Sequence, residues 1–323
     1  MPIIKRQSRI LLVCSFVSIA TAFWVLPASA ASYTVQTITH PDDPAFTQLL
    51  GINNAGTVAG FHGMSVNQGF TLTLPNTFTT ENFPGATQTI VTAINGTGDT
   101  AGIYVDAAGA NHGFTHVGGT FLTVDQTNTT FNQALGINNG NTTVGYSSTD
   151  FTGQTLQQAN SQSNGVFSDI DALLPTNSNS QAVGINNGNN IVGFYMPSDR
   201  TSIGFLDIGN TIWTIQPFGS SSTQALGING SGEIVGTYID AAGLQHGYTD
   251  IGGTFATFDV GSVSTTVNGV NDSGQLVGFY TGENNSVVGF VATPAVPEPS
   301  TISMLLLGLL AIPAYFRRNR SVR

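Results

Sequence analysis

One residue pattern in this chain has the chemistry of a sugar-binding site. An aromatic residue is followed by a carboxylate, by Ala-Ala-Gly and then by a histidine, and the order occurs twice: Tyr104, Asp106 and His112, then Tyr238, Asp240 and His246. An aromatic ring can stack on a sugar while the carboxylate and imidazole bind hydroxyl groups. The alternative is structural, with a packed tyrosine, an aspartate in a turn and a histidine at a strand start. The sequence leaves both interpretations open.

Residues for catalysis are harder to find. Glycoside hydrolysis needs a pair of carboxylates, but the local pairs, Asp42 with Asp43 and Asp169 with Asp171, have the character of loop residues. The chain has no G-x-S-x-G, H-E-x-x-H or P-loop motif. We therefore predict no catalytic residue, although acids from distant parts of the chain could still meet in the fold.

The remaining histidines and one irregular stretch complete the candidates. His40, His62 and His116 have no metal-ligand spacing, so we interpret them as ordinary surface or turn residues. The polar stretch from Ser147 to Asn164 is the least repetitive part of the body, and Arg200 is the only cation there. A unique site would lie in that sector, although a tolerated loop insertion is the simpler interpretation.

A Gly-Ile-Asn turn, with small variations, recurs through the body of the chain. Its asparagine is spaced by 42, 43, 48, 43 and 42 residues, at Asn53, Asn95, Asn138, Asn186, Asn229 and Asn271. We interpret these residues as turn formers, because Asn hydrogen-bonds its own turn and the following Gly supplies positive φ. The alternative is a calcium site made from a ring of Asn and Asp oxygens that includes Asp99 and Asp272. The loops lack the dense carboxylates of an EF-hand, and we predict no other cofactor.

Each repeat predicts four short strands. The second strand ends in Gly plus an aromatic residue, as at Gly145-Tyr146, and the third begins at Gly-Phe, as at Gly113-Phe114. The fourth alternates between apolar and polar residues, as in 120–125. Four strands in about 43 residues form the blade of a β-propeller. The sequence therefore predicts an all-β, six-bladed propeller of four-stranded blades over residues 31–294.

The two ends of this domain predict how the ring closes. The sixth repeat loses its fourth strand after Gly289-Phe290-Val291, while 33–38 reads as an unpaired fourth strand before the first repeat. Pairing of 33–38 with the last strand of the sixth repeat would leave no open strand edge in the ring. The alternative, an open solenoid, would need capping units at both ends. Small residues beside the first strands, as at Ala134-Leu135-Gly136, suit the crowded wall of a central channel.

Charge is distributed very unevenly. Between the terminal segments there are 17 acidic residues and one basic residue, which gives a net charge of about −16. Such a body repels phosphate backbones, so nucleic-acid binding is excluded. The only cysteine, Cys14, lies in the N-terminal segment, and the body therefore has neither disulfides nor a thiol nucleophile.

The N-terminal segment predicts export. Three basic residues within 5–9 precede an apolar stretch over 10–26, and Ala28 and Ala30 lie where a signal peptidase reads small residues. We expect residues 1–30 to be a secretory signal peptide that is cut after Ala30. The alternative is an uncleaved anchor, for which the apolar run is slightly short.

The C-terminal segment, 295–323, has three parts. Pro297, Glu298 and Pro299 come first, followed by an apolar run over 302–316 and an Arg-rich end. The run predicts a short helix that is marginal for crossing a membrane, and the arginines would hold the C-terminus in the cytoplasm. We therefore expect transient anchoring in the inner membrane. A simple permanent anchor is the alternative.

Two resemblances follow from these motifs. The tail resembles the PEP-CTERM family of bacterial sorting signals, which implies a Gram-negative envelope, an exosortase-type protease as partner and an organism that makes exopolysaccharide. The body resembles HAF-type extracellular repeats through Val235-Gly236, Val277-Gly278, His112-Gly113-Phe114 and His246-Gly247-Tyr248. That resemblance implies an exported repeat domain without an established activity.

We therefore expect a cell-surface or extracellular-matrix protein that acts as a structural or carbohydrate-binding module near exopolysaccharide. The competing hypothesis is a secreted propeller glycosidase or polysaccharide lyase, with its acids contributed by different blades.

Overall fold

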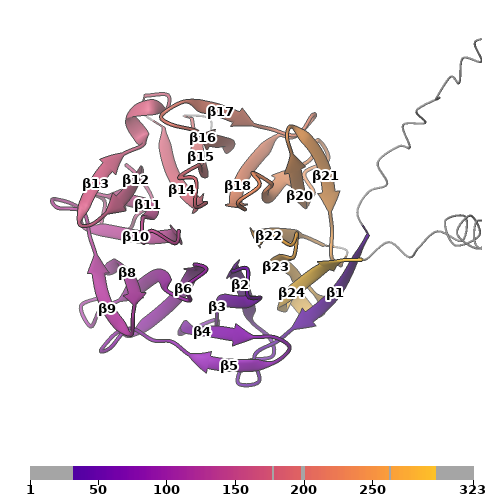
Figure 1. Cartoon of the computed structure of the whole chain (residues 1–323), viewed down its shortest axis with the longest axis horizontal. Helices are drawn as coiled ribbons and strands as arrows, with labels where there is room; N and C mark the ends of the chain where they lie inside the picture. Colours follow the sequence, from indigo (N-terminus) through magenta and orange to yellow (C-terminus); the bar gives the residue numbers. More distant parts are fainter. Residues whose placement is uncertain (1–31, 177, 198–200, 262, 296–323) are drawn as a thin grey trace, which may run out of the picture. The chain divides into compact units, whose positions relative to one another are not determined.

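The computed structural model describes residues 32–176, 178–197, 201–261 and 263–295, which form six four-stranded antiparallel sheets in a ring (Figure 1). The prediction of an all-β, six-bladed propeller is confirmed. Several predicted features lie outside the described residues: signal-cleavage positions Ala28 and Ala30, sorting motif Pro297, Glu298 and Pro299, the apolar segment 302–316, and Arg200.

Each blade is a meander whose first strand lies innermost. Blade 1 has β2 (Thr47–Ile52), β3 (Thr57–His62), β4 (Gln68–Thr73) and β5 (Thr77–Thr80). Blade 2 has β6 (Gln88–Ile94), β7 (Thr100–Val105), β8 (Asn111–Val117) and β9 (Thr120–Val124). Blade 3 has β10 (Phe131–Ile137), β11 (Thr143–Ser148), β12 (Gln158–Ser163) and β13 (Val166–Asp169).

The second half of the ring repeats this plan. Blade 4 has β14 (Asn179–Ile185), β15 (Ile191–Met196), β16 (Ile203–Asp207) and β17 (Ile212–Ile215). Blade 5 has β18 (Ser222–Ile228), β19 (Ile234–Ile239), β20 (Gln245–Ile251) and β21 (Thr254–Phe258). Blade 6 has β22 (Thr265–Val270), β23 (Leu276–Thr281), β24 (Val287–Pro294) and β1 (Tyr33–Ile38).

The ring is closed by the two ends of the propeller, as predicted. β1 pairs antiparallel with β24, in a register that runs from Tyr33 opposite Pro294 to Ile38 opposite Gly289. Figure 1 shows the indigo β1 beside the yellow β24. The first strand of the described residues therefore becomes the fourth strand of blade 6 and completes that sheet.

Small residues allow the inner strands to crowd together. Every inner strand has a register shift at its centre, as between Ala182 and Gly184 in β14. A Cβ atom on Gly184 would lie 3.2 Å from the Cα atom of Gly227 in the next blade. The extra residue of each bulge turns toward the channel, where Leu135 and Leu226 line the wall. This confirms the prediction of a crowded central wall.

The recurring glycine of the second strands also has a packing cause. In blade 5, a Cβ atom on Gly236 would lie 2.0 Å from the backbone oxygen of Gln224 and 2.9 Å from Cε1 of Tyr248. Tyr248 is fully buried, as are its counterparts in four other blades: Phe70, Phe114, Phe205 and Phe290. The glycine therefore makes room for the large aromatic side chain that fills the blade core.

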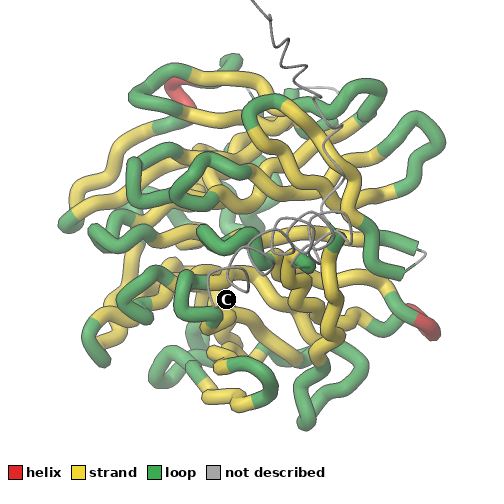
Figure 2. Tube along the Cα trace, turned by 45° about the vertical axis from the view of Figure 1, so that its right-hand side comes forward, coloured by secondary structure: helices red, strands yellow, loops and turns green. Residues whose placement is uncertain are grey.

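Helix is almost absent from the part that the structure describes (Figure 2). Its two helical segments are three-residue 3-10 turns, η1 (Asp171–Leu173) and η2 (Glu283–Asn285). Within residues 32–295, apart from the gaps given above, no helix has the length and apolar character needed to cross a membrane.

Candidate functional site

The asparagine series forms a closed ring of hydrogen bonds around one mouth of the channel. Each Nδ2 donates to the backbone oxygen of the equivalent asparagine in the next blade, at 3.0 to 3.4 Å. The last one, Asn271, donates to Asn53 at 3.1 Å and completes the circle. Each Oδ1 also accepts backbone N–H groups of its own turn, as Asn53 does from Ala55 and Thr57. Turn formation is confirmed, but in blades 3 and 4 the positive φ falls on Asn141 and Asn189 and not on the glycine. Fastening between blades is a second role that the sequence did not reveal.

This bonding leaves the ring poorly suited to calcium. The Oδ1 atoms already accept two N–H groups each, and the Nδ2 atoms cannot bind a cation. Asp272 is similarly engaged, since its Oδ1 accepts the N–H of Gly230 at 2.6 Å and its Oδ2 accepts Nδ2 of Asn54 at 2.7 Å. These residues therefore fasten neighbouring blades and do not present a set of converging oxygen ligands.

In blade 2, the predicted residues Tyr104, Asp106 and His112 do come together. The Tyr104 ring lies between Phe83 and His112, with centroid distances of 3.8 and 4.8 Å. Oδ1 of Asp106 accepts two N–H groups of its own turn, at 2.8 and 2.9 Å. Much of the polar capacity of this site is therefore used inside the protein.

The histidine in each copy lies between two carboxylates. Nδ1 of His112 is 2.6 Å from Asp125, and its Nε2 is 3.5 Å from Asp106. The sequence analysis missed Asp125 and its blade 5 counterpart, Asp259. Both follow their histidine by 13 residues, and that shared spacing was the signal available in the sequence.

Blade 5 reproduces this arrangement with Tyr238, Asp240 and His246. Nδ1 of His246 lies 2.8 Å from Asp259, and Nε2 lies 3.4 Å from Asp240. The Tyr238 ring is 5.2 Å from the His246 ring, and its hydroxyl pairs with Thr257 at 2.8 Å. The two predicted sites are therefore built alike, but Tyr238 is half-buried whereas Tyr104 is buried.

Local hydrogen bonds shift the pKa of three of these groups. The backbone N–H of Ala110 lowers the pKa of Asp106, and that of Leu244 lowers the pKa of Asp240. The hydrogen bond with Asp259 raises the pKa of His246. Blade 5 therefore holds two carboxylates around an imidazole that keeps its proton to a higher pH than a free histidine does.

The largest cavity among the candidate sites lies at the end of the central channel where the inner strands begin. It has a volume of about 450 Å³. Its walls carry amide and hydroxyl groups, aromatic rings and aliphatic side chains, among them Gln48, Gln181, Gln224, Phe194, Phe279 and Leu226. Within the described residues, no charged side chain lines it. The opposite mouth is the asparagine ring.

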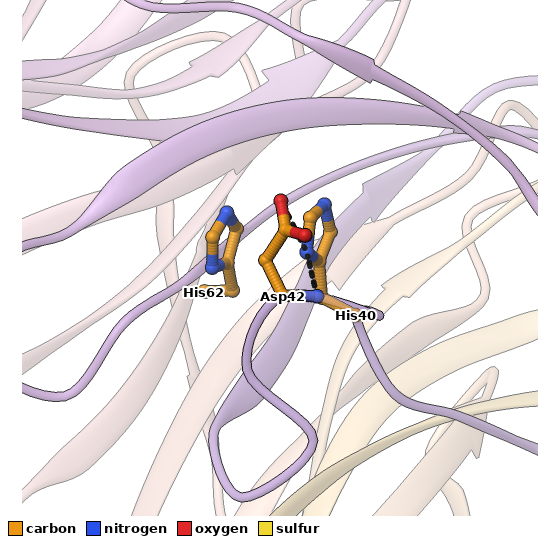
Figure 3. Close-up of side chains that lie close together, drawn as sticks. All are labelled: His40, Asp42 and His62. Carbon is orange, nitrogen blue, oxygen red and sulfur yellow. Dashed lines mark hydrogen bonds and ion pairs between the residues drawn. The ribbon is translucent and has the colours of Figure 1, made fainter.

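Two histidines that the sequence analysis treated as ordinary surface or turn residues meet beside blade 1. The rings of His40 and His62 are stacked with centroids 3.7 Å apart, and Asp42 lies next to them (Figure 3). His40 opens the turn that ends at Asp43, as the expectation allowed, but it is buried and does not lie on the surface. Burial, followed by the neighbouring His62, lowers the pKa of His40. Imidazole lone pairs lie in the plane of the ring, and the two ring planes are nearly parallel, with an angle of 5° between them. One ring would therefore have to turn before both could bind one ion.

The irregular stretch from Ser147 to Asn164 forms the end of β11, a folded loop and β12. Asp150 organises the loop by accepting the N–H groups of Thr152 and Thr155, which holds the pKa of Asp150 at about 2. This self-contained bonding agrees with a tolerated insertion.

Comparison with known families identifies the C-terminal tail. Residues 295–320 match the model of the PEP-CTERM protein-sorting motif. This motif implies an exported, cell-surface protein whose C-terminal sorting segment is processed by an exosortase. A search of curated proteins found no match to the chain.

Several solved structures are similar to the propeller. A structure of AofleA from Arthrobotrys oligospora is 12% identical, with a TM-score of 0.48, over 80% of this chain and 86% of that one. The Aleuria aurantia lectin, described as a six-bladed propeller with a novel fucose recognition mode, is 9% identical, with a TM-score of 0.45, over 76% and 90%. The propeller domain of the Trilobed protease from Pyrococcus furiosus is 11% identical, with a TM-score of 0.43, over 76% and 95%. At these values, function has to be argued from the residues of this chain.

Proposed function

We propose that this protein is a carbohydrate-binding or structural module that is displayed at the cell surface in contact with exopolysaccharide. The sorting motif supplies the destination. The resemblance to HAF-type extracellular repeats and the predicted cleavage after Ala30 belong to the same proposal, because both support a location of the propeller outside the cytoplasm.

The cavity at the channel end is the observation that carries the binding function. Its volume of about 450 Å³ lies within the range of small-molecule sites. Amides such as Gln48 and Gln224 can bind hydroxyl groups, and the rings of Phe194 and Phe279 offer apolar faces. An uncharged lining of this kind suits a neutral sugar, which has hydroxyl groups above and below an apolar ring face.

Binding is favoured over hydrolysis by the same lining. The cavity has no carboxylate, whereas a glycosidase needs two at a defined separation. The carboxylates near His246 are engaged with the imidazole and with their own turns. The propeller therefore has a place to hold a sugar without the acid and base needed to cleave it there.

Glycan-array binding of the full chain, in a polyoxyethylene detergent that carries no sugar, tests this function. We expect retention on neutral glycans, equal with calcium and with EDTA. Gln48→Ala should weaken binding by roughly two- to tenfold, the value of one neutral hydrogen bond. Gln36→Ala, on the exposed face of β1, is the matched control and should bind like the wild type. Release of reducing ends without measurable binding would show that the protein is an enzyme instead.

A further inference from the structure

Blades 2 and 5 carry the same Tyr-Asp-His arrangement but differ in the segment that leads into them. Before β6 the chain reads Phe83-Pro84-Gly85, and before β18 it reads Pro217-Phe218-Gly219. Tyr104 follows Phe83 by 21 residues, and Tyr238 follows Pro217 by 21 residues. The two segments therefore occupy equivalent positions in their blades. The order of proline and phenylalanine is therefore exchanged between two otherwise matching blades.

In blade 2 the phenylalanine covers the tyrosine. The Phe83 ring lies 3.8 Å from the Tyr104 ring, with an angle of 2° between their planes. It also packs against Phe121 and Phe114, with centroids at 5.6 and 5.9 Å. One flat six-membered ring thus fills the space between Tyr104 and the outer strand β9.

In blade 5 the exchanged order turns the phenylalanine away. Phe218 is fully exposed, and a cavity of about 250 Å³ is found beside the tyrosine. Besides Pro217 and Phe218, its lining is Tyr238, Tyr248, Phe255, Ala256 and Thr257. These five residues are the positional counterparts of Tyr104, Phe114, Phe121, Leu122 and Thr123, so the cavity occupies the place that the Phe83 ring fills in blade 2. We call this cavity the Tyr238 slot.

We propose that the Tyr238 slot binds one pyranose ring of a neutral glycan, with the apolar face of the sugar on the Tyr238 ring. This inference rests on the proposed carbohydrate-binding function and assigns it a second, specific site. Phe83 shows that the equivalent space accepts a flat ring stacked on the tyrosine.

Charge and hydroxyl groups favour a neutral sugar as the occupant. No lining residue of the slot is charged, and the acidic body repels anionic polymers. The hydroxyl groups of Tyr238 and Thr257, which lie 2.8 Å apart, can exchange hydrogen bonds with sugar hydroxyls. A buried aromatic side chain from a protein partner would leave this hydroxyl pair unused.

Fluorotyrosine NMR of the full chain in a polyoxyethylene detergent tests the proposal. The chain has 8 tyrosines, and Tyr238→Phe assigns the signal of interest. The probes are methyl glycopyranosides of glucose, galactose and mannose. We expect at least one of them to shift the Tyr238 signal and to leave the Tyr104 signal unchanged. In Phe83→Ala, which vacates the matching space in blade 2, both signals should shift, while the control Phe151→Ala, at an exposed phenylalanine of the blade 3 loop, should leave the Tyr238 response in place.

The outcomes separate this inference from the proposed function. Tyr238 also lines the channel cavity, so the shift is measured in two variants. An unchanged Tyr238 titration in Gln48→Ala and a weaker one in Thr257→Ala would support the slot, whereas the reverse would assign the shift to the channel cavity and overturn the slot. Glycan binding on the array without any Tyr238 shift would also overturn the slot and would leave the proposed function in place. Absence of glycan binding in both assays would overturn both. A shift with N-acetyltyrosinamide but with none of the sugars would identify the slot as a site for an aromatic side chain and refute a sugar ligand.

Discussion

Removal of one asparagine side chain from the inner ring should destabilise the whole propeller. Asn186 is 7% exposed and makes three hydrogen bonds. Its Nδ2 donates to Asn229 at 3.0 Å, and its Oδ1 accepts the N–H groups of Gly188 and Asn190 at 2.9 and 3.0 Å. Because each of these hydrogen bonds contributes about 1 kcal/mol, Asn186→Ala should lower the free energy of unfolding by about 3 kcal/mol.

Equilibrium unfolding in urea, followed by circular dichroism, measures this loss. The matched control is Asn187→Ala, the next residue in the same turn. Asn187 is exposed, and its side chain accepts a single N–H group, that of Asn139 at 2.9 Å. We expect the control to cost no more than about 1 kcal/mol.

Asn186→Asp separates the two roles of the side chain. The new carboxylate keeps both acceptor functions but places negative charge against the backbone oxygen of Asn229. We expect the loss to be larger at pH 7 than at acidic pH, where the protonated group can again donate a hydrogen bond. The inter-blade role of the asparagine ring would be refuted by either of two results. One is an equal loss of unfolding free energy in Asn186→Ala and Asn187→Ala, and the other is a loss below about 0.5 kcal/mol in Asn186→Ala.

Three further predictions follow from packing, charge and sorting. Gly278→Ala would place a Cβ atom 2.0 Å from the backbone oxygen of Thr266. We therefore expect this variant to lower the free energy of unfolding, measured in urea, by at least about 3 kcal/mol. The control Gly140→Ala, at an exposed position, should lower it by about 0.5 kcal/mol or less. Asp259 raises the pKa of His246, so this pair stabilises the fold below the ordinary histidine pKa of 6.5 and the contribution is lost as pH rises through the folded pKa. The melting-temperature difference between the wild type and His246→Gln should therefore be larger near pH ~5 than near pH ~8.5, and an equal difference would contradict it. Deletion of Pro297, Glu298 and Pro299 should leave the protein in the inner membrane on cell fractionation, and unchanged release would argue against processing at this motif.

The regular part of the architecture could be predicted because every blade repeats it. The spacing of Asn53 and its equivalents indicated six turns, and strand alternation indicated four strands for each turn. The split of the last blade between 33–38 and Gly289-Phe290-Val291 was also visible, because one strand was missing at one end and extra at the other.

The contacts between repeats could not be predicted. The Nδ2 of Asn53 reaches an oxygen of Asn95 in the next blade, and that contact depends on how the ring curves. The stacking of His40 on His62 likewise requires the segment after β1 to fold back on blade 1. Alternation along a strand assigns a side chain to a face of its sheet, but it does not identify which residue of another blade that side chain contacts.

The different order of proline and phenylalanine at 83–84 and 217–218 was visible in the sequence, but its structural consequence could not be predicted from it. Both dipeptides combine proline with phenylalanine, and both are typical of a turn before a strand. Only the structure shows that one order covers a tyrosine and the other exposes it. A candidate binding site thus arose from the exchange of two neighbouring residues.

All of these sites depend on a ring that is closed by the chain's own first and last strands. In the register of β1 and β24, Thr34 lies directly opposite Thr293, and both are exposed. Cysteines at these two positions, in a Cys14→Ser background, should form an intramolecular disulfide on oxidation, detected by mass spectrometry of the linked peptides. Failure to form this bond in folded protein, or formation only between separate chains, would contradict the closed ring.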